Sequence, residues 1–161
     1  MRMSGDTAWA MTSNRTHIFT LPNQGTEPAL GSVPRCLLAI TRLAPGVTAT
    51  ALADIFKRTR GRHRDLGIVG AMLFDGEHFG LLLCGESAQV GRAFDALLVD
   101  PRQALPVVLF DGPNVPSWAA RGWRSGWSEP DGLATLAAAD SPRDGAAMQA
   151  LQVLIGASDL L

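Results

Sequence analysis

Short apolar runs alternate with two helical patterns in the central part of the chain. The runs are too short for free-standing helices and are typical of buried strands. They lie at residues 36–40, 67–74, 79–83 and 105–110, with a weaker run at 122–127. Residues 48–61 and 87–99 instead place apolar side chains three and four apart, which predicts helices. Thr48 or Thr50 can cap the first helix, and Asp75-Gly76 predicts a tight hairpin.

The order of these elements predicts an α+β fold. It reads βαββαβ plus a fifth strand, the order of a ferredoxin-like sandwich with two helices on one face of the sheet. Residues 1–34 are rich in Thr, Asn, Gly, Pro and Ser and predict a flexible N-terminal arm. Residues 35–128 then form the domain, and residues 129–161 form a C-terminal helical extension.

The last predicted helix carries an apolar stripe that must be buried. Its members, spaced for one helix face, are Met148, Leu151, Leu154 and Ile155. Docking on the bare face of the chain's own sheet would bury them. Binding a partner or a second copy of the chain would do the same, and both interpretations stay open at this point.

Composition restricts the class of protein. The 161 residues suit a single domain. A net charge of −1 provides no field to attract nucleic acid or an anionic membrane, so we expect no specific nucleic-acid partner. No stretch of about 18 apolar residues and no signal peptide is found, which predicts a cytoplasmic chain without a membrane span.

The inventory of reactive residues predicts neither an enzyme nor a metal site. Two cysteines and three histidines are too few and too scattered for a typical zinc site. No Ser-His-Asp, Cys-His or paired-carboxylate arrangement has supporting context. Counting strand alternation from Ile40 and Leu81, we expect Cys36 and Cys84 to point to opposite faces and to form no disulfide.

Several motifs together carry a resemblance to a known family. They are Gly67-Ile68-Val69-Gly70, the Leu83-x-Gly85-x-x-x-x-Val90 pattern entering the second helix, the Asp100-Pro101-Arg102-Gln103 stretch, and Trp123 on the fifth strand. Over about residues 35–128 the chain resembles the BLUF domain, a flavin-binding sensor of blue light. The resemblance implies a slot for FAD between the two helices and an output through protein contacts, often with self-association.

The family's light-sensing residues are replaced in this chain. In the family, a strand-one tyrosine and a strand-three glutamine relay protons to the flavin, and an asparagine after helix one holds the ring. By the resemblance these positions fall at Ile40, Leu81 and His63, and the chain contains no tyrosine. We expect Ile40 and Leu81 to share one layer and fill the slot with hydrocarbon. The other pocket positions implied by the resemblance are Arg62, Arg102 and Trp123.

Three functions follow from this reasoning. The first is a regulatory or assembly module that acts through protein contacts, has lost the family's photochemistry and binds no cofactor. The second is an FAD-binding sensor of blue light or redox state, with tryptophan as electron donor. The third is an anion or nucleotide binder at the cations around the predicted end of helix one: Arg60, Arg62 and Arg64. A solvated helix end explains the same cations.

Overall fold

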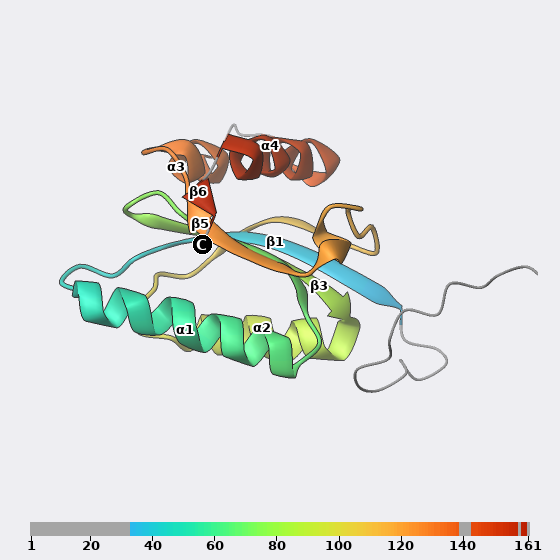
Figure 1. Cartoon of the computed structure of the whole chain (residues 1–161), viewed down its shortest axis with the longest axis horizontal. Coiled ribbons are helices and arrows are strands. Elements are labelled where there is room, and N and C mark those ends of the chain that lie inside the picture. Colours follow the sequence, from blue (N-terminus) through green and yellow to red (C-terminus); the bar gives the residue numbers. More distant parts are fainter. Residues whose placement is uncertain (1–32, 139–142, 158, 161) are drawn as a thin grey trace, which may run out of the picture.

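One sheet lies between two layers of helices (Figure 1). The computed structural model describes residues 33–138, 143–157 and 159–160. Its elements are β1 (Pro34–Arg42), α1 (Ala49–Asp65), β2 (Val69–Phe74), β3 (His78–Glu86), α2 (Ser87–Leu98), β4 (Val107–Gly112), the short 3-10 helix η1 (Ala119–Arg121), β5 (Trp123–Trp127), α3 (Gly132–Ala137), α4 (Asp144–Ala157) and β6 (Asp159–Leu160). The predicted α+β, ferredoxin-like fold with a fifth strand and a C-terminal helix is confirmed.

The strand order is β4-β1-β3-β2-β5-β6. Strand β2 pairs with β5 in parallel, and the other pairs are antiparallel. The predicted hairpin joins β2 to β3: the Asp75 amide donates to the His78 carbonyl at 3.2 Å, and Gly76 has a φ of 104°. A positive φ is easy for glycine, which explains the strength of this local signal.

Both faces of the sheet are apolar, because strand side chains alternate between them. Helices α1 and α2 cover the face that carries Leu81, and α3 and α4 cover the face that carries Ile40. Docking of the last helix on its own sheet is confirmed. Three members of its apolar stripe are buried in the core on the α3/α4 face of the sheet, and the fourth is partly buried there. These side chains, Met148, Leu151, Ile155 and Leu154, therefore pack against the chain's own sheet.

The two cysteines form a disulfide, contrary to the prediction. Cys36 on β1 lies directly opposite Cys84 on β3, and the two are bonded. Residues directly opposite each other in an antiparallel pair project from the same face. The prediction was wrong because it took Ile40 and Leu81 as sharing a face. In the observed register these two residues project from opposite faces.

Helix α1 is longer than the sequence predicts. The predicted cap is confirmed, since Thr48 Oγ1 accepts a hydrogen bond from the Ala51 amide at 3.2 Å. The predicted end near Gly61 is wrong, because the helix continues to Asp65. One internal glycine costs only about 1 kcal/mol relative to alanine, and packing against the sheet offsets that cost. The cations assigned to a loop therefore lie on a helix, and its last turn carries Arg62, His63 and Arg64.

Some predictions concern residues or features that the structure only partly covers. The predicted arm, residues 1–34, lies outside the described residues except for its last two. Among the helices that are described, none is long and apolar enough to cross a membrane. Over the same part of the chain, no three His, Cys, Asp or Glu side chains gather as a metal site would require.

Candidate functional site

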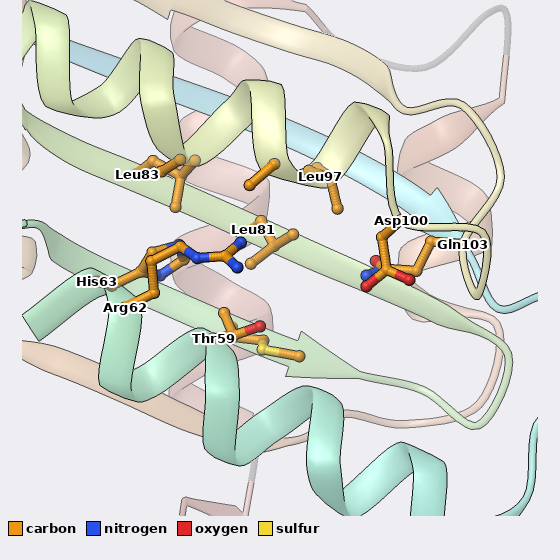
Figure 2. A pocket seen from close by; sticks show the side chains of 11 residues that line it. Thr59, Arg62, His63, Leu81, Leu83, Leu97, Asp100 and Gln103 are labelled. Atoms are coloured by element: carbon orange, nitrogen blue, oxygen red, sulfur yellow. The ribbon is translucent and has the colours of Figure 1, made fainter.

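A small cavity lies between α1 and α2, against the sheet (Figure 2). Its volume is about 30 Å³, enough for one or two water molecules. Figure 2 shows Arg62 and His63 projecting from α1 beside Leu81 of β3, with Asp100 and Gln103 at the other end. The full lining is Thr59, Arg62, His63, Met72, Leu81, Leu83, Ala93, Ala96, Leu97, Asp100 and Gln103. We refer to this cavity as the slot.

The structure brings most of the predicted pocket residues to the slot. Arg62, His63 and Leu81 line it directly. The Trp123 ring packs edge-on against the His63 ring, with 4.5 Å between centroids. Arg102 stands just outside the lining and is held by carboxylates, as described below. Three of the six predicted positions therefore line the slot, and two more, Trp123 and Arg102, lie beside residues that line it.

Ile40 does not belong to the slot. It pairs with Gly80 across β1 and β3, and its side chain is buried on the α3/α4 face. The residue directly opposite Leu81 is Ala39, which shares the α1/α2 face with it. The expectation that Ile40 and Leu81 share one layer is wrong, because the observed register places their side chains on opposite faces of the sheet. Alanine, like isoleucine, carries neither a phenol nor any other polar group.

His63 is the most perturbed titratable group at the slot. Only 4% of its surface is exposed, and no hydrogen bond reaches its Nδ1 atom. Burial, reinforced by the positive charge of Arg62, lowers the pKa of His63 to about 4. The imidazole is therefore neutral at pH 7 and can offer one donor and one acceptor nitrogen. Trp123 Nε1 beside it is also buried without a partner.

This pKa predicts that acid destabilises the fold through His63. Below the unfolded-state pKa of about 6.5, the unfolded chain binds a proton that the folded chain excludes until pH 4. Stability therefore falls as pH drops through this window, by up to about 3 kcal/mol, and levels off below it. Urea unfolding at several pH values, compared with His63→Asn, measures the effect. Parallel profiles for the two proteins would contradict the assignment.

A charged network fixes the far end of the slot. Arg102 donates from Nε and Nη2 to the two carboxylate oxygens of Asp100, at 2.9 and 2.7 Å. Its Nη1 donates to Asp54 on α1 at 3.0 Å. The hydrogen bond from Arg102 keeps the pKa of Asp100 below its usual value. Gln103 Oε1 is buried here without a partner, so this end still has a free acceptor.

The predicted anion site is not assembled. Arg62 lines the slot, whereas Arg60 and Arg64 line a different hollow on the other side of α1. Residues two apart on a helix do not face the same side, since successive residues are separated by 100°. The three arginines therefore do not converge on one ligand as the prediction required.

Sequence reasoning missed several residues that line the slot. On α1 these include Thr59, three and four residues before Arg62 and His63, and on α2 Ala93 and Leu97. Both sets follow helical spacing, so projecting α1 and α2 as helices facing each other could have found them. Ala39 could have been found only from the strand register, which apolar runs do not define.

Comparison with known proteins identifies a family. Residues 36–123 match the family BLUF, described as sensors of blue-light using FAD. Among solved structures, the chain is similar to BlsA in a photo-activated state, with a TM-score of 0.58 and 17% identity over 77% of this chain and 94% of that one. It is also similar to the dark state of BlrB, a BLUF protein, with a TM-score of 0.55 and 20% identity over 60% and 74% of the two chains. At these identities the structural likeness shows the fold alone.

Other matches are to much longer proteins. This chain spans only 24% of a bacterial light-regulated adenylyl cyclase and 22% of BlrP1 from Klebsiella pneumoniae, solved with FMN and cyclic diGMP. A search of curated proteins found no match.

Proposed function

Because this chain belongs to the BLUF family of sensors of blue-light using FAD, we propose that it is a signalling domain without the family's tyrosine–glutamine photocycle. Its output passes through protein contacts, with a partner or a second copy. The observation that carries the proposal is the chemistry of the two strands beneath the slot. Ala39 and Leu81 lie opposite each other on the slot face, and the chain contains no tyrosine.

Hydrocarbon at these two positions cannot perform the relay that the family uses. A tyrosine supplies an oxidisable ring and a transferable proton, and a glutamine supplies an amide that can change partners. The side chains of Ala39 and Leu81 have no polar atom. Both are buried, and a water molecule in the slot would supply neither an oxidisable ring nor an amide.

A flavin fits the polar atoms of the slot but not its present volume. His63 Nδ1 and Gln103 Oε1 are buried without partners at the two ends of the slot, and each can hydrogen-bond a polar atom of a planar heterocycle. The cavity of about 30 Å³ is far below the roughly 300 Å³ at which ligand sites begin. Helices α1 and α2 would have to separate to admit the ring.

A flavin-binding sensor is the second candidate, and family membership supports it more directly than it supports lost photochemistry. In that case His63 and Gln103, at the two ends of the slot, would contact different polar atoms of the ring. Trp123 is an oxidisable side chain at the site, packed 4.5 Å from His63 between ring centroids. A flavin supplies light absorption and electron acceptance when bound, and the protein's part is to hold it with these groups.

Illumination of the purified full chain tests both candidates. After reconstitution with FAD, we expect no reversible red shift of flavin absorption under blue light, because no phenol or amide is present at Ala39 or Leu81. A reversible red shift would overturn the first proposal. A yellow protein that undergoes another light-driven change, lost in Trp123→Phe, would establish the second candidate in its place.

A further inference from the structure

A second and larger hollow lies on the other side of α1, beside the end of β5. Its volume is about 750 Å³, within the range typical of small-molecule sites. No residue lines both this hollow and the slot. Strand β5 lies between β2 and β6 in the sheet, and Figure 1 shows α1 on one face of that sheet. We refer to this hollow as the α1/β5 groove.

The floor of the groove is aromatic and aliphatic. It includes Leu52, Phe56 and Trp127. Trp127 leaves 42% of its surface exposed, yet its position is fixed by ring contacts. The ring centroids are 5.9 Å from Phe56 and 5.3 Å from Phe74. A large apolar ring that is both held and exposed offers a preformed contact for an apolar ligand.

The rim of the groove is cationic. Lys57, Arg60 and Arg64 all line it, are exposed, and follow one another on α1 at helical spacings of three and four. The described lining contains no carboxylate. Arg64 has Asp65 at 3.6 Å, with both side chains exposed, and such a pair is weak. By contrast, Arg58 is already held by Asp54 on another side of the helix.

We propose that the α1/β5 groove binds an amphiphilic anion. The aliphatic or aromatic body of the ligand lies on Leu52, Phe56 and Trp127, and its carboxylate or sulfonate meets the cations at the rim. An apolar floor bordered by several cations, with no acid in the described lining, complements this combination, whereas a fully polar anion would leave the floor uncovered. The proposal is independent of flavin binding, because the two hollows share no lining residue.

Titration of the full chain with dodecanoate below its micellar concentration tests the ligand class. Isothermal calorimetry measures affinity, and the part of the tryptophan fluorescence change that is absent in Trp127→Phe reports on Trp127. We expect dodecanoate to bind about tenfold more tightly than dodecanol, since one charge-assisted contact suffices for that ratio. Added salt should weaken the binding of dodecanoate but not that of dodecanol. Equal affinity for dodecanol, or preference for dodecyltrimethylammonium, would overturn the proposal.

Matched variants test the place of binding. The double variant Arg60→Gln with Arg64→Gln should bind dodecanoate about tenfold more weakly. The control, Arg92→Gln with Arg121→Gln, makes the same change in net charge elsewhere and should leave the affinity for dodecanoate nearly unchanged. Ala53→Trp, on the groove wall, should block binding without removing a charge. Binding that survives Ala53→Trp would place the ligand elsewhere. A dimer of the unliganded chain that shields Trp127 would show that the groove is an interface, and would also overturn the proposal.

Discussion

Replacing Gly70 with alanine is expected to lower the free energy of unfolding by more than about 4 kcal/mol. Gly70 has a φ of 142°, and an added Cβ atom would lie 1.9 Å from the Leu82 carbonyl oxygen of the neighbouring strand. The Cβ position is set by the backbone and the atom that it meets is a backbone oxygen, so no rotamer change relieves the overlap. Typical domains are stable by only about 5–15 kcal/mol. The variant should therefore lose a large fraction of the domain's stability.

Gly122 provides the matched control for this experiment. Its φ is 115°, but an added Cβ would meet nothing within 4 Å. Gly122→Ala should consequently lower the free energy of unfolding only by the backbone strain, about 1–2 kcal/mol. Urea unfolding followed by circular dichroism measures both variants. Similar losses in the two would show that conformation rather than the close approach to Leu82 restricts position 70.

The same geometry explains what the Gly67-Ile68-Val69-Gly70 motif does in this chain. Gly67 has a φ of 66° and follows the end of α1, and Gly70 allows β2 to lie against β3. Between them Ile68 is buried in the core under α1 and α2. The motif therefore brings β2 into the sheet beside the slot, and its persistence is explained by folding without any flavin.

The positions of the elements could be predicted because they depend on local patterns. Buried strands give apolar runs, helices give three-and-four spacing, and the Asp75-Gly76 turn needs a residue that accepts positive φ. Register has no such local signature when both faces of a sheet are apolar. Ile40 and Ala39 are equally suitable for either face, so only the pairing of β1 with β3 shows which one lies on the face covered by α1 and α2.

Of the two candidate sites, the slot could be predicted in part from the sequence and the α1/β5 groove could not. His63, Leu81 and Trp123 could be placed at the slot because motifs of the resemblance fix their positions. The α1/β5 groove could not be predicted, because it depends on α1 continuing beyond Gly61 and on where β5 ends beside it. The spacing of Lys57, Arg60 and Arg64 was the available signal, and it was obscured by ending the helix four residues early.

The carboxylate of Asp75 joins the β2–β3 turn to the C-terminal helices. Its Oδ1 accepts hydrogen bonds from the Glu77 and His78 amides, at 3.0 and 2.7 Å. Its Oδ2 accepts from the Leu133 and Ala134 amides at the start of α3, at 3.2 and 3.4 Å. The side chain is only 1% exposed, so water cannot take its place.

Asp75→Ala is therefore expected to lower the free energy of unfolding by about 4 kcal/mol. Four backbone donors lose a charged acceptor, and unpaired buried donors cost about 1–3 kcal/mol each, with partial relaxation. Asp75→Asn keeps one carboxamide oxygen and should lose about half as much. Leu133, buried over Gly80, would no longer be held in place, so amide exchange in α3 should accelerate far more than in α1. Uniform acceleration across both helices would mean that Asp75 stabilises the turn alone.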